Sequence, residues 1–233
     1  MVPAVGGHGE GPTFLNQVTN NGVFAALAAL TITLPVFLPL AVSIVAGDAI
    51  AGEASLGTLR YLLARPTGRG RLLAVKAATV VVFGFAATFA VAAAGLIVGS
   101  ILFPVGRVTT LSGDTLSLWS GIIRISGAAG IVALSLFGLA ALGFFASTLT
   151  DVAIGAMAAT LGILVPSGVL DAIPQLSAIH PWMLTHGWLS FGDLLRTHIT
   201  WTAIEKNLAL QAGYVVVFAS AAWANFRTKD VLA

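Results

Sequence analysis

Long uninterrupted runs of apolar residues constrain this chain more than any other feature of its sequence. Each run reaches roughly 20 residues without a charge, the length of helix that crosses a hydrocarbon core of about 30 Å. Of the 233 residues, 58% are hydrophobic and only 9% are charged. A soluble domain carries about 25% charged residues, because its surface must face water. We therefore predict an all-α, polytopic membrane protein.

The composition also excludes several other classes. A transmembrane barrel needs short segments in which apolar and polar residues alternate, whereas these runs are continuous. The eleven basic residues are spread along the chain and make no basic face, so no nucleic-acid partner is expected. The chain contains no cysteine, which removes disulfides, thiolate metal ligands and thiol nucleophiles.

Five spans are expected in one transmembrane domain. The domain covers residues 1–233, with spans at about 23–46, 72–103, 125–148, 152–170 and 207–226. Pro35 and Pro39 predict a kink in the first span. Gly95 and Gly99 form a GxxxG pair in the second, which favours close helix packing. The segment 171–206 is rich in proline, glycine and tryptophan, which indicates short helices at the outer membrane interface.

The distribution of basic residues predicts the orientation. If the interval 47–76, which contains the loop 47–71, and the C-terminal tail lie in the cytoplasm, the basic residues divide seven inside to four outside. The inner set is Arg60, Arg65, Arg69, Arg71, Lys76, Arg227 and Lys229, and the outer set is Arg107, Arg124, Arg196 and Lys206. The N-terminus then lies outside without an export signal. Either a further span precedes it, or the short, nearly uncharged tail crosses the membrane by itself.

The cytoplasmic interval predicts a short amphipathic helix over Glu53–Arg65. Leu56, Leu59 and Leu63 recur at helical spacing, and the charged residues lie off that stripe. Pro66 ends the helix. Such a helix, held between two spans, suits docking of a cytoplasmic partner, although it could equally rest on the membrane surface.

The same interval resembles a known family. The matching residues are Gly52-Glu53, Gly57-Thr58-Leu59-Arg60, Leu62-Leu63, Pro66, Arg69 and Lys76, with Asn225-Phe226-Arg227 and Lys229-Asp230 at the end of the chain. This pattern is similar to that of the ABC-2 type permeases, the membrane subunits of ATP-driven exporters. Those permeases usually have six spans, with the matching loop between the second and third. Five are found here, so the family's first helix and the interfacial helix before it have no counterpart.

The resemblance implies a permease subunit in the cell membrane. Two copies, identical or related, would form the translocation pathway, each docked on a separate ATPase through a coupling helix. The implied coupling residues are Glu53, Leu56, Leu59, Arg60 and Leu63, with the charges of Glu53 and Arg60 exposed to the ATPase. The chain lacks a G-x-x-x-x-G-K-[ST] run, so ATP and Mg²⁺ are expected on the partner, and neither catalysis nor a cofactor is expected here.

Candidate pathway residues are hydroxyl and aromatic side chains within the spans. They are Thr31, Thr33, Phe37, Thr88 and Phe89, and ordinary core packing is the other interpretation of each. The substrate class stays open, because an apolar pathway suits drugs, lipids and other amphipathic molecules.

The ionisable residues near the outer segment predict no site. His180, His186 and His198 have spacings that match no compact metal motif, so no metal is expected. No pair of carboxylates lies in a span core, which argues against intramembrane acid–base catalysis. The alternative to a permease is a membrane scaffold or intramembrane enzyme that does not transport, with its amphipathic loop lying on lipid.

Overall fold

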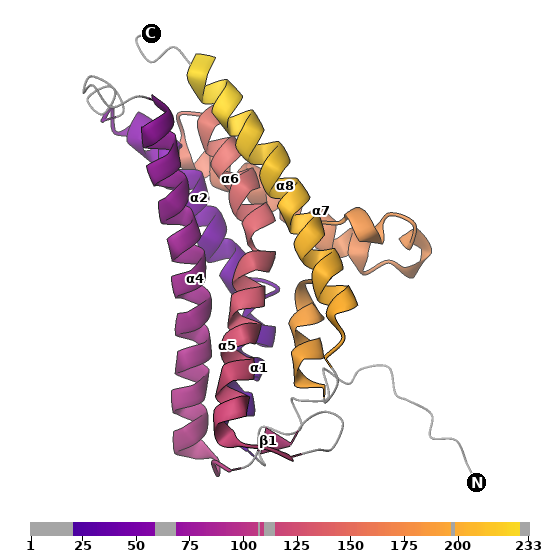
Figure 1. Cartoon of the computed structure of the whole chain (residues 1–233). Helices are drawn as coiled ribbons and strands as arrows, with labels where there is room; N and C mark the ends of the chain where they lie inside the picture. The colour runs from indigo at the N-terminus through magenta and orange to yellow at the C-terminus, as the bar shows by residue number, and fades with distance from the viewer. Residues whose placement is uncertain (1–20, 59–68, 107, 110–114, 197–198, 229–233) are drawn as a thin grey trace.

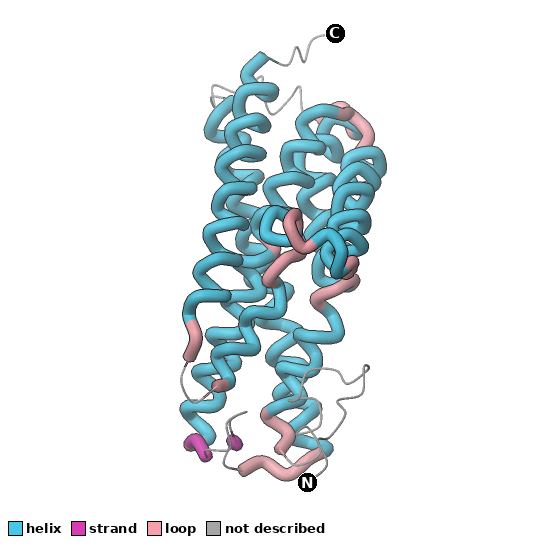
Figure 2. The backbone as a smooth tube through the Cα atoms, turned by 90° about the vertical axis from the view of Figure 1, so that its right-hand side faces the viewer, coloured by secondary structure: helices cyan, strands magenta, loops and turns pink. Residues whose placement is uncertain are grey.

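The structure, a computed structural model, describes residues 21–58, 69–106, 108–109, 115–196 and 199–228. Within these ranges the chain is a bundle of long helices that run along a common direction (Figures 1 and 2). Five helical segments are long and apolar enough to cross a membrane: Phe37–Ser55, Arg69–Leu102, Leu118–Leu149, Ala153–Asp171 and Trp201–Arg227. The protein is therefore a multi-pass, all-α membrane protein, which confirms the predicted fold class.

The elements follow one another with few long connections among the described residues. The α-helices are α1 (Phe24–Thr33), α2 (Phe37–Ser55), α4 (Arg69–Leu102), α5 (Leu118–Ser135), α6 (Phe137–Leu149), α7 (Ala153–Asp171) and α8 (Trp201–Thr228). Three 3₁₀ helices stand between α7 and α8: η2 (Pro174–Leu176), η3 (His180–Trp182) and η4 (Trp188–Leu195). A two-stranded antiparallel ribbon, β1 (Val108–Thr109) with β2 (Thr115–Leu116), joins α4 to α5 and was not predicted.

The predicted kink in the first apolar run is a full break. Helix α1 ends at Thr33 and α2 begins at Phe37, with Pro35 between them and Pro39 in the first turn of α2. Proline removes a backbone donor and clashes with the preceding turn, which accounts for the break. Helix α2 then continues to Ser55, well past the predicted end of the span at residue 46.

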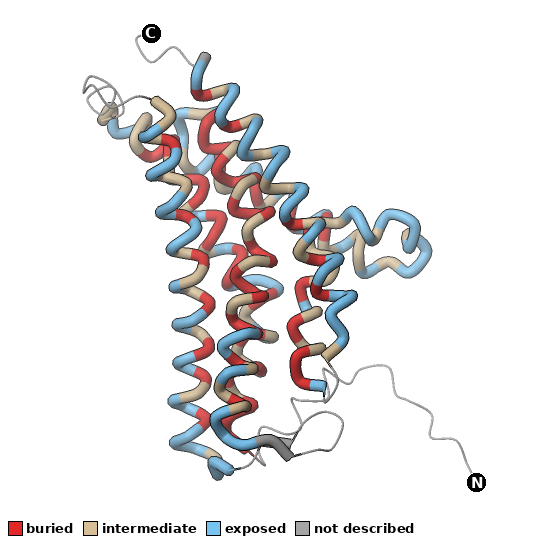
Figure 3. Tube along the Cα trace, viewed as in Figure 1, coloured by how far each residue is buried: buried red, intermediate tan, exposed pale blue. Residues whose placement is uncertain are grey.

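Helices α5 and α6 form the central rod of the bundle. They are separated only by Leu136, and 72% of the residues in the apolar stretch of this segment are buried, against 22% in α4 and α7 and 17% in α8. Figure 3 shows buried positions on the inner sides of the helices and exposed ones on the outer sides of α4 and α8. The exposed side chains of these peripheral helices are largely apolar, as expected where lipid is the solvent.

The GxxxG pair packs α4 against α1. An ideal Cβ on Gly99 would lie 2.1 Å from the carbonyl oxygen of Gly22, and one on Gly95 would lie 2.6 Å from the Cα of Ala26. Lipid gives helices no hydrophobic drive to associate, so close backbone contact supplies the packing energy. The predicted close approach at these glycines is confirmed.

Different hydrogen bonds join the helices at the two ends of the bundle. At one end Arg69 Nη1 donates to the carbonyl oxygen of Arg227 (3.1 Å), and Asn225 Nδ2 donates to that of Thr148 (2.9 Å). The start of α4, the end of α6 and the end of α8 therefore lie together, and the end of α2, from which the loop to α4 leaves, lies at the same end of the bundle (Figure 1). We call it the loop end. At the opposite end the Gly22 N–H donates to the carbonyl oxygen of Pro104 (3.0 Å).

Two span boundaries were predicted too far along the chain. Helix α5 begins at Leu118 rather than near residue 125, and α8 begins at Trp201 rather than at residue 207. Each helix thereby includes charged residues. In α5, Arg124 Nη1 donates to the carbonyl oxygens of Leu194 (2.8 Å) and Arg196 (2.7 Å), so its charge lies against the end of η4. The short helices predicted within 171–206 are confirmed as η2, η3 and η4.

Candidate functional site

The loop end holds an ion pair that joins the two helices on either side of the predicted coupling segment. Glu53, in the last turn of α2, accepts a hydrogen bond at Oε1 from Lys76 Nζ of α4 at 2.6 Å. The two side chains are only 27% and 26% exposed. A charge-assisted bond in such a partly shielded position is stronger than an exposed surface pair. The pair therefore fastens the end of α2 to the beginning of α4.

A second contact holds the chain immediately after α2. Thr58 donates from Oγ1 to the carboxylate of Glu53 and to its backbone carbonyl oxygen, the latter at 3.1 Å. Gly57 adopts a left-handed conformation with φ +68°, which a residue without a Cβ accommodates easily. These features end α2 and turn the chain into the following loop.

This geometry corrects the predicted start of the coupling helix. Glu53 belongs to the spanning helix α2, and the turn at Gly57 interrupts any helix that would run from Glu53 through Arg65. Glu53 was expected to expose its charge to a partner, but its carboxylate is engaged by Lys76 and Thr58. Sequence reasoning went wrong here because the helical spacing of the leucines gives no sign of the turn at Gly57.

The other coupling residues are placed only in part. Leu56 is 77% exposed at the loop end, one of the most exposed large apolar side chains. Leu59, Arg60 and Leu63 lie outside the described residues. The Glu53–Lys76 pair borders a shallow cavity of about 370 Å³, which is also lined by Asp48, Ser55, Leu56 and Thr79.

Helix α2 is also connected to the central rod close to the loop end. The hydroxyl oxygen of Ser147 in α6 accepts hydrogen bonds from the backbone N–H groups of Ile50 and Ala51, both at 2.9 Å. Ser147 is fully buried. The end of α2 is therefore bonded both to α4 through Lys76 and to α6 through Ser147.

The five pathway candidates differ in exposure, and the hydroxyls among them bond within their own helices. The hydroxyls of Thr31, Thr33 and Thr88 donate to carbonyl oxygens of their own helices, at Leu27 (2.8 Å), Ala29 (2.7 Å) and Gly84 (3.0 Å). This back-bonding is a common way to satisfy hydroxyls inside helices. Thr88 is buried, whereas Phe37 and Phe89 are 65% and 42% exposed.

A cluster of polar side chains lies inside the bundle beside the break between α5 and α6. We call Ser135, Ser190, Asn207 and Gln211 the polar centre. Asn207 Nδ2 donates to Ser135 Oγ at 2.6 Å, and Gln211 Nε2 donates to the carbonyl oxygen of Leu184 at 2.9 Å. Asn207 and Gln211 are 3% and 2% exposed. Buried amides are unusual in spans and typically have structural or functional roles.

The polar centre depends on a glycine in α6. A Cβ on Gly138 would lie 2.2 Å from Oε1 of Gln211, so a larger residue there would displace the end of that side chain. Sequence reasoning treated Gly138 as a general packing residue and overlooked the amides. The spacing of Asn207 and Gln211, one helical turn apart on α8, could have identified them as one polar face.

Two histidines of the outer segment lie close together. The ring centroids of His180 and His186 are 6.1 Å apart, and His186 Nδ1 is 2.8 Å from Oδ1 of Asp171. His180 Nε2 lies 3.0 Å from the carbonyl oxygen of Ile173. His198 is outside the described residues, and within those residues no group of three or more histidine, aspartate or glutamate side chains is arranged to hold a metal ion.

Comparison with known proteins places the chain in a family without assigning an activity. No curated protein matches the sequence. Residues 11–232 match a family described as protein of unknown function (DUF2705). That match covers almost the whole chain, so this protein belongs to the DUF2705 family.

Proposed function

We propose that this protein is the permease subunit of an ATP-driven ABC exporter in the cell membrane. In this proposal two copies form the pathway, and each is coupled to a separate ATPase that binds ATP and Mg²⁺. The loop end faces the cytoplasm, and the segment after α2 is the contact with the ATPase.

The observation that carries the proposal is the attachment of this segment to the spans at both ends. Helix α2 precedes the loop and α4 follows it, and the Glu53–Lys76 ion pair joins the two helices with an N–O distance of 2.6 Å. Arg69, at the start of α4, reaches the backbone of Arg227 in α8. A push on the loop would thus move α2, α4 and α8 together instead of bending one flexible connection. This is the behaviour needed from a lever that drives rigid-body rocking of helices.

The break at Leu136 supports the same mechanism. It divides the most buried span into α5 and α6, and α6 packs against α2, α7 and α8. At the break the Leu136 N–H still donates to the carbonyl oxygens of Val132 and Ala133 (both 3.2 Å), and the polar centre bonds α8 to Ser135 and to Leu184 beside it. We therefore assign Leu136 and the polar centre as the hinge about which the loop-end half of the bundle tilts.

Copurification tests the proposed partnership. The tagged full-length chain, extracted from native membranes in mild detergent, is expected to bring down a separate Walker A protein in near-equal amount. The purified complex should hydrolyse ATP, and vanadate should stop that hydrolysis. A preparation that contains no such protein and hydrolyses no ATP would favour the alternative, a membrane scaffold or an intramembrane enzyme.

A further inference from the structure

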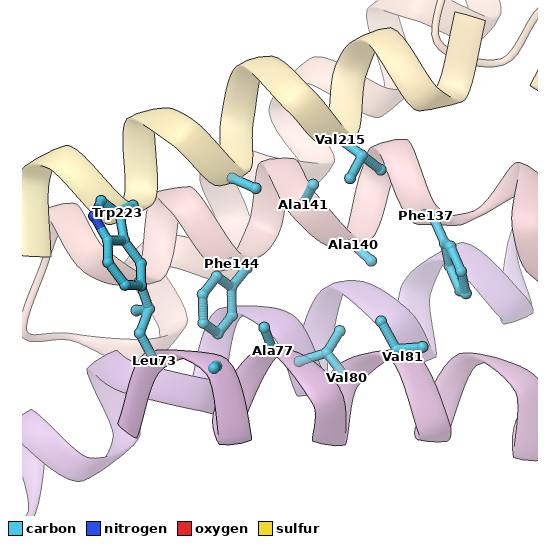
Figure 4. A pocket seen from close by; sticks show the side chains of 12 residues that line it. Leu73, Ala77, Val80, Val81, Phe137, Ala140, Ala141, Phe144, Val215 and Trp223 are labelled. Atoms are coloured by element: carbon cyan, nitrogen blue, oxygen red, sulfur yellow. The ribbon is translucent and has the colours of Figure 1, made fainter. Parts of the chain in front are cut away.

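An apolar groove runs along the outside of the bundle between α4, α6 and α8 (Figure 4). It has a volume of about 240 Å³. Its walls extend from Leu73 to Val81 on α4, from Phe137 to Phe144 on α6 and from Val215 to Trp223 on α8. The floor is formed largely by alanines, including Ala77 and Ala140. Small side chains at these positions leave a channel that larger ones would have filled.

The length of the groove matches one leaflet of a bilayer. The walls cover eight residue steps on α4 and α8 and seven on α6, which is about 11 to 12 Å at 1.5 Å per residue. Half of a hydrocarbon core of about 30 Å is about 15 Å. The groove begins near the loop end, at Leu73 and Trp223, and finishes beside Phe137, next to the break between α5 and α6. At that inner end Phe85 packs edge-on against Phe137 with ring centroids 5.4 Å apart.

The outer mouth of the groove carries positive charge and an interfacial aromatic residue. The Trp223 ring packs over Gly70, where an added Cβ would lie 2.5 Å from the indole. Arg227 is exposed one turn beyond Trp223 on α8, and its carbonyl oxygen holds the guanidinium of Arg69 at 3.1 Å. Tryptophan and arginine are the residues that anchor at the headgroup level of a membrane.

We propose that this groove binds one acyl chain of an anionic phospholipid whose headgroup phosphate contacts Arg227 and Arg69. An acyl chain gains little by leaving other lipids for an apolar groove, since both surroundings are hydrocarbon. The shape of the groove therefore determines where the acyl chain lies, and the two arginines select the headgroup. The site would exist whether or not the protein is a permease.

Native mass spectrometry of the delipidated full-length chain tests this site, with dioleoyl phosphatidylglycerol and dioleoyl phosphatidylcholine as the probes. One phosphatidylglycerol is expected to bind with clear preference over phosphatidylcholine. Arg227→Gln should weaken binding of phosphatidylglycerol about fivefold, the effect of one basic residue near an anionic surface. It should weaken binding of phosphatidylcholine less, because the choline ammonium already balances the charge of that phosphate.

Matched variants separate the site from general attraction to lipid. Arg71 lies two residues from Arg69, about 200° around α4, so Arg71→Gln removes the same charge from another face. It should change the preference less than Arg227→Gln does. Ala77→Leu fills the groove and should weaken binding of both lipids, whereas Ala78→Leu, at an exposed position outside the groove, should not. Circular dichroism checks that each variant is folded.

A second readout keeps the proposal testable if a variant unfolds. Phosphatidylglycerol with brominated acyl chains should quench the tryptophan fluorescence of the wild-type chain, and Trp223→Phe should remove a distinct part of that quenching. Equal affinity for the two headgroups, or equal effects of Ala77→Leu and Ala78→Leu, would overturn the assignment. Quenching that Trp223→Phe does not alter would also overturn it.

Discussion

The Gly99→Leu substitution is expected to lower the free energy of unfolding by about 3 kcal/mol, the upper part of the range for overpacking. A Cβ at this position would lie 2.1 Å from the carbonyl oxygen of Gly22 and 2.7 Å from Cβ of Ala25. The nearest atom belongs to the backbone, so no rotamer change relieves the clash and α1 must move away from α4. Thermal unfolding in detergent micelles, followed by circular dichroism, measures the loss.

Gly162 in α7 provides the control for this experiment. No atom lies within 4 Å of a Cβ built there, and the residue faces outward. Gly162→Leu is expected to leave stability unchanged or slightly raised, because leucine has the better helix propensity. If both substitutions had the same effect, the close contact between α1 and α4 would not be a determinant of stability.

Reversing the charge of Glu53 is expected to reduce ATP-coupled transport at least about tenfold, because Glu53→Lys breaks a charge-assisted bond and places two lysines together. Lys76 would then repel residue 53 instead of holding it at 2.6 Å. The loop could move without moving α2 and α4 together. ATP hydrolysis and substrate uptake in proteoliposomes containing the reconstituted complex measure the loss of coupling.

The double substitution Glu53→Lys with Lys76→Glu is expected to recover most of the transport, since it restores the pair with its charges exchanged. Asp193→Lys is the matched control. It reverses an ion pair of similar length, with Arg196 at 2.9 Å, but one that spans only three residues at the end of η4 and links no two helices. No recovery in the exchanged pair, or an equal loss from Asp193→Lys, would show that the pair does not transmit force.

The spans could be predicted from the sequence because the bilayer imposes a simple rule on length and hydropathy. The break at Pro35 and the close packing at Gly95 and Gly99 were predictable for similar reasons, since each depends on the local chemistry of proline or glycine. The start of α5 was not. In the sequence, the charge of Arg124 indicates the end of a span. In the structure, its guanidinium donates to the carbonyl oxygens of Leu194 and Arg196, so the helix can continue past it.

The candidate site was harder to predict because its contacts connect residues far apart in the chain. Glu53 meets Lys76, Ser147 meets the backbone of Ile50, and Asn207 meets Ser135. A single sequence identifies Glu53 as a charge at the end of an apolar run but gives no partner for it. The sequence therefore indicated that Glu53 was available for an external contact. In the structure its carboxylate instead holds α2 and α4 together.

Crosslinking from Leu56→Cys tests the central claim most directly. The chain contains no cysteine, so the introduced thiol is unique, and Leu56 is 77% exposed at the loop end. The predicted result is a crosslink to the ATPase whose yield changes between the nucleotide-free and the vanadate-trapped complex. Leu102→Cys, 66% exposed at the opposite end of α4, should give none. Labelling of Leu56→Cys by a membrane-impermeant maleimide from outside intact cells, with no ATPase adduct, would contradict the account.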